Sequence, residues 1–271
     1  MPTSSLVVFS DLDGTLLDHS TYEHAAAREA LERLRVEGVP LVLCTSKTRA
    51  EVEPLRRALD NRHPFIVENG GGLFVPSGYF PFPIANAERR GDYEVIAFGR
   101  PYRTLVDALA AAARETGANV RGFATMDDAE VASVTGLPVD AARLARRREF
   151  DEPFMIMEMD RRNDLLAAIE RGGYRWTAGG RFYHIMGSND KAAAVSRLLT
   201  LYRQHLGRVR SMGLGDAPND AEFLNIVDLP VLIASPRLDR LRALVPGGTA
   251  TVRPGPAGWN DAVLAALAAP R

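Results

Sequence analysis

The sequence has a single cysteine, Cys44, among its 271 residues. One thiol cannot form a disulfide within the chain, and it excludes a metal site built from several cysteines. Its apolar neighbours Val42 and Leu43 indicate a buried thiol in a strand. No apolar stretch approaches the ~20 residues needed to span a bilayer, and no secretory signal is visible at the N-terminus. These absences favour a cytoplasmic protein without a membrane partner.

An excess of charge of one sign is also lacking. The 33 basic residues are matched by 34 acidic ones, which gives a formal net charge of -1. The only basic run, Arg146–Arg148, is typical of a solvated helix face, so a nucleic-acid partner is not expected. Lysine is scarce: only two of the 33 basic residues are lysines, Lys47 and Lys191, and the others are arginines. An ammonium is more compact than a guanidinium, so these two lysines are candidates for functional positions, although a biased genome would also explain them.

Apolar runs that alternate with helical periods predict an α/β core. Runs at 6–9, 39–44 and 65–67 alternate with helical periods at 23–37 and 49–59, which is the pattern of a doubly wound parallel sheet. The same alternation returns between residues 191 and 268. We therefore predict a Rossmann-like doubly wound parallel-sheet core formed by residues 1–88 plus 189–271.

The segment 89–188 has a different pattern and predicts an inserted α+β cap domain. It mixes helical periods with short strand-like runs, and the segment 74–83 before it is expected to be an irregular or hairpin connection. The expected strands of the insertion are 95–98, 154–159, 174–176 and 182–185, and the expected helices are 104–116, 127–135, 139–147 and 163–171.

Acidic residues follow two predicted strands of the core. Asp11 and Asp13 come directly after the first strand, and Asp216 and Asp220 follow the strand at 211–214. Ligands of open parallel sheets bind beyond the carboxyl ends of the strands. Carboxylates gathered there repel one another unless a cation offsets them, and oxygen ligands alone favour Mg²⁺ over zinc. The sequence therefore predicts a magnesium site, although Asp220 is also placed to cap its helix, and Asp11 to Asp13 to form an ordinary turn.

An anion is indicated at the same edge of the sheet. Lys191 opens the predicted helix 191–205, where a cation is unfavourable for the helix dipole unless an anion lies beside it. Thr45 and Ser46 end the strand at 39–44 and offer hydroxyl and N–H groups to that anion, although Ser46 also suits a helix N-cap. Carboxylates, hydroxyls and a lysine together predict a phosphoryl-transfer site.

Two segments resemble motifs of the haloacid dehalogenase (HAD) superfamily of phosphatases. Asp-Leu-Asp-Gly-Thr-Leu-Leu at 11–17 resembles its first motif, and Gly-Leu-Gly-Asp-Ala-Pro-Asn-Asp at 213–220 its fourth. The resemblance implies that Asp11 attacks phosphorus to form an aspartyl phosphate and that Asp13 is the general acid and then the base. It also implies the remaining roles: Thr45 holds the phosphoryl oxygens, Lys191 neutralises them, and Mg²⁺ is bound by Asp11, the Asp13 carbonyl and Asp216, with Asn219 and Asp220 supporting. One departure is Ala192 after the motif lysine, where the family often has glycine.

The insertion resembles the type IIB cap of sugar-phosphate phosphatases. Segments 45–49, 68–71 and 184–191 resemble the mannosyl-3-phosphoglycerate phosphatases among them. The implied partner is a small phosphorylated glycoside, mannosyl- or glucosyl-3-phosphoglycerate, whose carboxylate needs a second cation such as Lys47. The other implied substrate-binding residues are Ser46, Arg49, Asn69, Gly70, Arg181, His184 and Ser188.

Other interpretations of these residues and of the chain remain open. Lys47 and Arg49 also suit solvated charges at a helix start, His184 suits a core or strand-face histidine, and Gly70 a tight turn. The whole chain also suits a phosphatase for sucrose 6-phosphate or a hexose phosphate, a phosphomutase, or a non-catalytic phospho-sugar-binding regulator. A regulator is expected to have lost its nucleophile or acid, and this chain keeps both. A monomer and a homodimer are equally compatible with the sequence.

Overall fold

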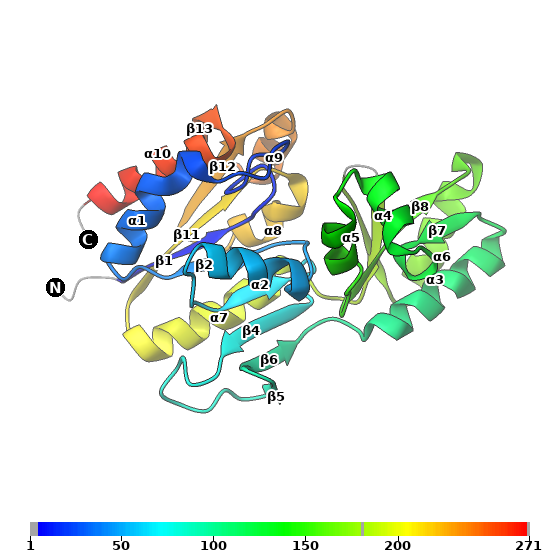
Figure 1. Cartoon of the computed structure of the whole chain (residues 1–271), viewed down its shortest axis with the longest axis horizontal. Helices are drawn as coiled ribbons and strands as arrows, with labels where there is room; N and C mark the ends of the chain where they lie inside the picture. Colours follow the sequence, from blue (N-terminus) through cyan, green and yellow to red (C-terminus); the bar gives the residue numbers. More distant parts are fainter. Residues whose placement is uncertain (1–4, 180–181, 270–271) are drawn as a thin grey trace.

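The computed structural model describes residues 5–179 and 182–269 and shows a larger and a smaller lobe (Figure 1). Within those residues the larger lobe contains a nine-stranded sheet in the order β13-β12-β11-β1-β2-β3-β4-β6-β5. Its parallel strands are β1 (Ser5–Ser10), β2 (Leu41–Cys44), β3 (Phe65–Val67), β11 (Val209–Gly215), β12 (Leu229–Ala234) and β13 (Thr249–Pro254). Three antiparallel strands extend one edge, β4 (Gly72–Pro76), β5 (Glu88–Arg90) and β6 (Tyr93–Ala97). The predicted α/β fold class is confirmed.

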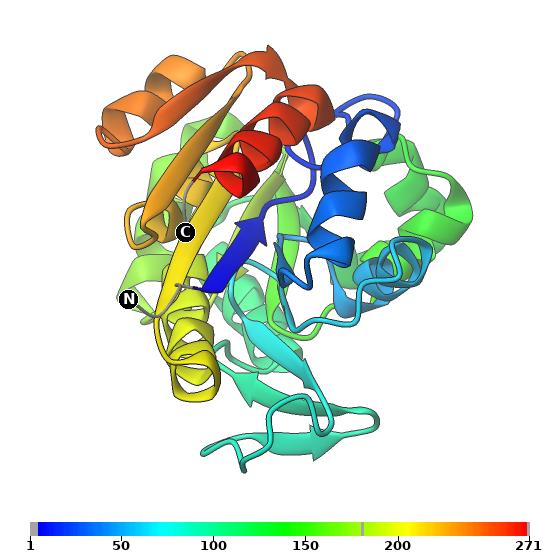
Figure 2. The ribbon, with the colours of Figure 1, turned by 90° about the vertical axis from the view of Figure 1, so that its left-hand side faces the viewer.

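Helices cover both faces of this sheet. The helices α1 (Arg28–Val36), α2 (Arg49–Ala58) and α10 (Gly255–Ala268) pack on one face, and α1 and α10 lie side by side (Figure 2). The other face carries α7 (Lys191–Leu206), α8 (Ala221–Leu224) and α9 (Leu238–Leu244). In β1, Val8 packs into the first layer while Val7 and Phe9 pack into the second. A strand buried on both faces is apolar throughout, which is why the sequence revealed it.

The smaller lobe is an antiparallel sheet with helices against it. Its strand order is β7-β8-β10-β9, and α3 and α6 cover the face that carries Phe154 and Ile185. The opposite face carries Met155 and Phe182, against which α4 and α5 pack. The elements are α3 (Tyr102–Thr116), β7 (Val120–Gly122), α4 (Asp128–Thr135), α5 (Val139–Ala145), β8 (Asp151–Ile156), α6 (Arg162–Arg171), β9 (Arg175–Gly179) and β10 (Phe182–Met186), and short 3₁₀ turns lie at Ala25–Ala27, Phe123–Thr125, Met159–Arg161 and Pro218–Asp220.

The structure differs from the sequence-based expectation at the first crossing between the lobes. The predicted boundary at residue 88 falls inside the large sheet, because β5 and β6 both pair within it. Strand pairing moves the crossing to the end of β6 at Ala97. The segment expected to be irregular contributes β4, which pairs with β3 and β6. The division into 1–88 plus 189–271 and 89–188 stays a prediction, with this shift at its first boundary.

A buried carboxylate ties the two lobes together. Glu68 follows β3 in a left-handed conformation with φ +50° and is fully buried. Its oxygens accept the N–H groups of Glu149, Phe150 and Asp151 over 2.7–3.0 Å. Phe150 packs in the core of the larger lobe. It lies against the backbone of Gly71, because a Cβ added at Gly71 would be 2.3 Å from the Phe150 Cβ. The segment between α5 and β8 is thus a third connection, beside the two places where the chain crosses.

None of the helices in the described part of the chain combines the length and apolarity that crossing a membrane requires.

The pH dependence of stability gives a test of the smaller lobe. Glu152 in β8 is 1% exposed and accepts hydrogen bonds from Tyr102 Oη (2.7 Å) and the Ala124 N–H (2.9 Å). Burial raises the pKa of Glu152 to about 7. The protonated carboxyl is then favoured in the folded state, so its stabilisation is complete below pH ~4.5 and is lost as the pH rises to ~7. A pKa rise of this size corresponds to roughly 3 kcal/mol of unfolding free energy.

We expect Glu152→Gln to remove this loss, because a neutral amide can keep both hydrogen bonds. The free energy of unfolding, measured by urea denaturation from pH 4 to pH 8, should fall less for the variant than for the wild type. Glu115→Gln is the control, since the Glu115 side chain is 58% exposed. A slope for Glu152→Gln equal to that of the wild type would contradict the expectation.

Candidate active site

Three carboxylates and one lysine meet at the carboxyl ends of β1 and β11. Asp11 follows β1, and its N–H donates to the Leu214 carbonyl at 2.9 Å. Lys191 Nζ donates to Asp11 Oδ1 at 2.8 Å and to Asp220 Oδ1 at 2.6 Å. Asp11, Asp216 and Asp220 each offer one oxygen atom, and these atoms lie within 4.8 Å of one another. The structure therefore brings together residues that are up to 209 positions apart in the sequence.

Backbone contacts and glycines make this convergence possible. Asp220 Oδ2 accepts the N–H groups of Asp216 (3.2 Å) and Ala217 (3.1 Å), so Asp220 fixes the loop as well as holding Lys191. A Cβ at Gly215 would lie 2.6 Å from the Asp220 Cβ. Gly14 has φ +79°, and a Cβ there would lie 2.9 Å from Asp216 Oδ2. Glycine at position 14 lets the two acidic loops approach each other, and glycine at position 215 lets the second loop fold back on itself so that Asp220 reaches the site.

Side-chain hydrogen bonds also fix the backbone of Asp11. Ser10 Oγ donates to the Asp11 carbonyl at 2.7 Å and accepts from Trp259 Nε1 at 2.9 Å. Trp259 of α10 is fully buried, so its indole N–H needs this partner. The helix on one face of the sheet thereby fixes the backbone that carries the Asp11 carboxylate.

The electrostatics of the cluster favour a bound cation. Burial raises the pKa of Asp11 well above its usual range, and the charge of Asp220 adds to this rise against the opposing effect of Lys191. Burial and Asp220 also raise the pKa of Asp216 to about 6. Burial acts to lower the pKa of Lys191, but Asp11 and Asp220 outweigh it and raise that pKa above its usual range. The cluster therefore keeps an ammonium and has more carboxylates than one ammonium can balance.

The donor atoms fit a divalent metal ion. Asp216 Oδ1 and Asp13 Oδ1 are buried without a hydrogen-bond partner among the described residues. Oxygen atoms of buried carboxylates are the ligands that hard divalent cations prefer. A cation beside Asp11, Asp216 and Asp220 would satisfy Asp216 Oδ1 and lower the raised pKa values.

A cavity of about 190 Å³ lies between the lobes over this cluster. The larger lobe lines it with Asp11, Asp13, Ser46, Asn69, Asp216 and Asn219, and the smaller lobe with Thr177, Ala178 and His184. A second cavity of about 530 Å³ shares Asn69, Thr177 and Asn219 with the first and extends past Trp176. The site thus combines an acidic floor with a wall from the smaller lobe.

The structure accounts for two predicted substrate-binding residues in new ways. Gly70 has φ +85°, and a Cβ there would lie 2.0 Å from the Asp190 carbonyl oxygen, so this glycine lets the backbone pack against the residue before Lys191. Lys47 Nζ lies 3.0 Å from Asp13 Oδ2 and 3.9 Å from Glu51 Oε1. Lys47 is therefore part of the site through Asp13, and it is not a solvated charge.

Other predicted residues lie away from the cavity. Thr45 is 1% exposed and its hydroxyl accepts the Lys47 N–H at 3.1 Å, while the next residue, Ser46, reaches the cavity. Thr48, not Ser46, caps α2, because Thr48 Oγ1 accepts the Glu51 N–H. Arg49 pairs with Glu149 (2.8 Å) and Glu53 (3.1 Å), Ser188 is exposed and lines neither cavity, and Arg181 lies outside the described residues.

Several cavity residues escaped the sequence analysis. Arg237 follows β12 and donates to Asp216 Oδ2 at 3.3 Å, so the strand-end rule applied to β12 could have found it. Thr177 and Ala178 lie opposite His184 and Tyr183 in the β9–β10 pair. No sequence motif marks them, because they reach the site only through this strand pairing. His19 and Ala217 complete the lining of the smaller cavity.

Comparisons with known proteins agree with this fold and site. Residues 8–75 match the model of a haloacid dehalogenase-like hydrolase family. A glucosyl-3-phosphoglycerate/mannosyl-3-phosphoglycerate phosphatase of Methanococcoides burtonii is 41% identical over 95% of this chain and 96% of its own. A mannosyl-3-phosphoglycerate phosphatase of Pyrococcus furiosus is 37% identical over 85% of this chain and 92% of its own.

A solved structure described as a HAD subclass IIB sugar phosphatase superposes with a TM-score of 0.63 at 18% identity, over 91% of this chain and 94% of its own. The chain belongs to the haloacid dehalogenase-like hydrolases. The names of its relatives also confirm the predicted resemblance to mannosyl-3-phosphoglycerate phosphatases.

Replacing Lys191 by a neutral residue should destabilise the protein, because the buried carboxylates would then lack their ammonium partner. In Lys191→Met, Asp11 and Asp220 would lose their shared partner, and breaking a buried ion pair costs about 3–5 kcal/mol of unfolding free energy. We expect a lower melting temperature in EDTA than for the wild type, and a larger rise on adding a divalent cation.

Arg197→Met is the control, because Arg197 sits in the same helix and its Nη2 donates to the carbonyl of the exposed Ala85, away from the cluster. The wild type should itself melt higher with divalent cation than in EDTA. Equal melting temperatures in both conditions would argue against a metal at this cluster.

Proposed function

We propose that this chain is a Mg²⁺-dependent phosphomonoester hydrolase that converts glucosyl-3-phosphoglycerate or mannosyl-3-phosphoglycerate into the glycosylglycerate and phosphate. The observation that carries the proposal is the buried cluster of Asp11, Lys191, Asp216 and Asp220 beneath a cavity that both lobes line. The substrate follows from the names of relatives that match most of the chain.

Asp11 is the nucleophile in this proposal. One of its carboxylate oxygens attacks phosphorus, the bond to the substrate oxygen breaks, and an aspartyl phosphate forms. Asp13, which lines the same cavity, gives its proton to the departing alkoxide. Asp13 then takes a proton from a water molecule as that water attacks phosphorus. The Asp11–phosphate bond breaks, and phosphate leaves with both carboxyl groups restored.

The remaining residues balance charge and hold positions. Lys191 faces Asp11 at 2.8 Å, so its ammonium lies where the phosphoryl oxygens would gather. Asp11, Asp216 and the Asp13 carbonyl would hold Mg²⁺, with support from Asn219 and Asp220. Bound Mg²⁺ supplies charge neutralisation at the phosphoryl oxygens. Ser46, which lines the cavity, would hold those oxygens from the loop after β2, and the same role for the buried Thr45 stays a prediction.

The wall of the cavity supports a substrate with a polar organic part. Asn69, His184 and Thr177 surround the space above the acidic cluster, and Lys47 approaches the site next to Asp13. A binding role for Arg49, Gly70, Arg181 and Ser188 stays a prediction, as do the cytoplasmic location, the absence of a nucleic-acid partner and the monomeric or dimeric state.

A substrate panel tests the proposal together with Asp11→Asn. The wild type with Mg²⁺ should release phosphate from a glycosyl-3-phosphoglycerate with a higher kcat/KM than from sucrose 6-phosphate or glucose 6-phosphate. Asp11→Asn removes the attacking charge, so its turnover should fall by at least about 10⁴-fold while the protein stays folded. Asp239→Asn is the matched control, because its side chain is fully exposed. Faster hydrolysis of the sugar phosphates would favour the alternative sugar phosphatase.

Lys47→Ala tests how the second lysine acts. Losing a charge-assisted hydrogen bond of roughly 1.5–3 kcal/mol should raise KM for a glycosyl-3-phosphoglycerate by about 10–100-fold. Glycerol 3-phosphate lacks the carboxylate, so its KM should change little. Arg57→Ala removes an exposed cation of α2, the helix that follows Lys47, and is the control. Equal losses on both substrates would mean that Lys47 acts through Asp13 alone.

A further inference from the structure

A buried ion pair lies behind the cavity wall, between the two lobes. Asp151 at the start of β8 is fully buried, and its Oδ1 pairs with Arg148 Nη2, a side chain that is 4% exposed. The same Arg148 nitrogen donates to the Ser46 carbonyl at 3.1 Å. Glu68 lies 3.7 Å from Arg148 Nε. Each of these contacts joins Arg148 to a hydrogen-bond acceptor, and the contact with Asp151 fixes one oxygen of its carboxylate.

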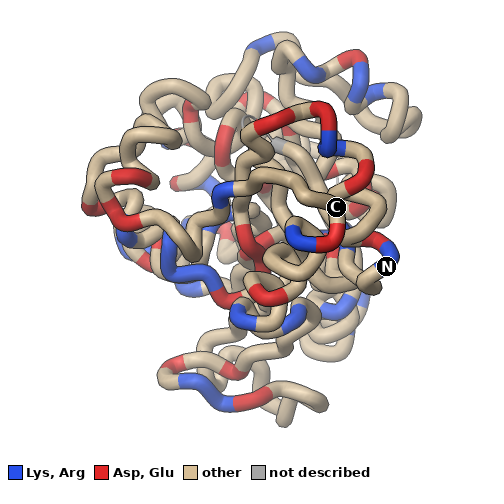
Figure 3. The backbone as a smooth tube through the Cα atoms, turned by 90° about the vertical axis from the view of Figure 1, so that its right-hand side faces the viewer, with Lys and Arg blue, Asp and Glu red and all other residues tan. Residues whose placement is uncertain are grey.

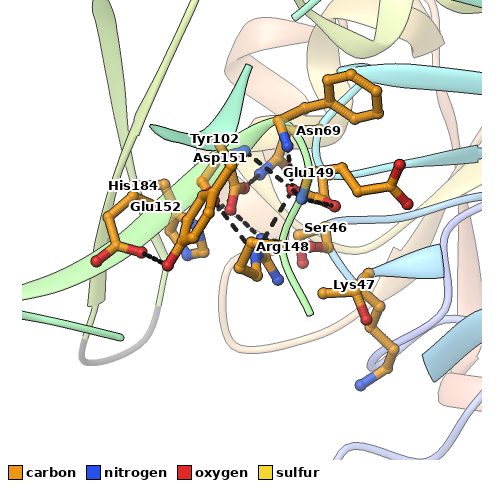
Figure 4. A network of polar contacts seen from close by, with 12 residues as sticks. Ser46, Lys47, Asn69, Tyr102, Arg148, Glu149, Asp151, Glu152 and His184 are labelled. Atoms are coloured by element: carbon orange, nitrogen blue, oxygen red, sulfur yellow. Dashed lines mark hydrogen bonds and ion pairs between the residues drawn. The ribbon is translucent and has the colours of Figure 1, made fainter. Parts of the chain in front are cut away.

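The other oxygen of Asp151 meets two side chains that line the cavity. Asp151 Oδ2 lies 3.1 Å from Asn69 Nδ2 and 3.1 Å from His184 Nδ1 (Figure 4). Asn69 comes from the larger lobe and His184 from β10 of the smaller one. Both line the 190 Å³ cavity. One carboxylate oxygen thus holds a residue of each lobe at the site.

The charge of Asp151 dictates the orientation of both partners. A carboxylate only accepts hydrogen bonds, so Asn69 must turn its NH₂ group and His184 its Nδ1–H toward it. Burial acts to raise the pKa of Asp151, but the charge of Arg148, together with the hydrogen bond from His184 Nδ1, outweighs it and lowers that pKa to about 2, which keeps the carboxylate charged. Asn69 Oδ1 is then left buried without a partner among the described residues. In neutral His184, Nε2 carries no proton and is the ring nitrogen that a ligand can reach.

We propose that Asp151 is a positioning residue that turns His184 Nε2 and Asn69 Oδ1 into hydrogen-bond acceptors for hydroxyl groups of the substrate's hexose. Two acceptors suit hydroxyl donors and do not suit a carboxylate or a phosphate. The role rests on the proposed function, because it concerns the organic part of that substrate. In this proposal Asn69 of the larger lobe and His184 of the smaller lobe recognise the hexose. Asp151 holds both of them in place.

Asp151→Asn should reverse this polarity. Arg148 has only donors, so it would take the amide oxygen of the new side chain, and the amide NH₂ would face His184 Nδ1. His184 would then carry its proton on Nε2 and present a donor to the cavity. KM for glucosyl-3-phosphoglycerate should rise about tenfold, with little change in kcat. The constants for 3-phosphoglycerate, which lacks the hexose, should stay within about twofold.

Glu152→Gln is the matched control. Glu152 is the next residue of β8 and is also buried, but it bonds Tyr102 and Ala124 on the opposite face of the sheet. His184→Gln and the double variant Asp151→Asn/His184→Gln complete the set. The KM of the double variant for glucosyl-3-phosphoglycerate should exceed that of Asp151→Asn by no more than about twofold, because both changes disrupt the same Asp151–His184 contact. A rise in KM for Glu152→Gln equal to that of Asp151→Asn, or equal losses on both substrates, would overturn the proposal.

The tautomer of His184 gives a readout that does not depend on activity. The chain has only five histidines, so ¹⁵N–¹H long-range spectra, with His184→Gln for assignment, can identify its ring nitrogens. Neutral His184 should be protonated on Nδ1 in the wild type and on Nε2 in Asp151→Asn. A wild-type proton on Nε2 would overturn the inference even if Asp151→Asn fails to fold. If the wild type does not prefer glycosyl-3-phosphoglycerates, the proposed function fails, whereas these spectra still test the positioning role.

Discussion

The contact of Lys191 with Asp11 and Asp220 is the interaction on which the site depends. Three carboxylates are buried close together at one end of the sheet, where their charges repel one another. An ammonium 2.6–2.8 Å from two of them offsets part of the repulsion. Burial, together with the repulsion that remains, raises the pKa values of Asp11 and Asp216. The same imbalance that makes the cluster costly in the free protein favours the binding of a divalent cation there.

In the proposed function, the two lobes divide the chemistry from the recognition of the substrate. The larger lobe places the acidic cluster at strand ends that rigid helices support on both faces. The smaller lobe adds Thr177, Ala178 and His184, whose positions follow from the pairing of β9 with β10. Buried polar contacts at Glu68 and Asp151 hold the two surfaces against each other. An acidic cluster at the strand ends of one lobe is thereby combined with a cavity wall from the other.

The sequence predicted the parts that local patterns encode. The core strands are apolar because both their faces are buried, and the acidic motifs follow those strands directly, so both fold and cluster could be recognised. The sequence predicted an irregular or hairpin connection at residues 74–83, because the glycines at 70–72 resemble a turn, and β4 (Gly72–Pro76) pairs antiparallel with β3 there. The pairing of Arg49 with Glu149 could not be read from the sequence either, and the substrate-binding role expected of Arg49 stays a prediction. Asp151 and Arg148 could not be found in this way, because their partners Asn69, Ser46 and His184 are distant in sequence.

The hydrogen bonds between Glu68 and residues 149–151 limit how the smaller lobe can be exchanged between related proteins. An insertion that touched its host only at the two crossing points could be exchanged between relatives as a module. Here the inserted lobe returns Phe150 to the host core and draws three backbone N–H groups onto a host carboxylate. A chimera that swaps the smaller lobe must therefore carry over residue 68 and the glycines that accommodate Phe150, or leave a charged group buried without partners.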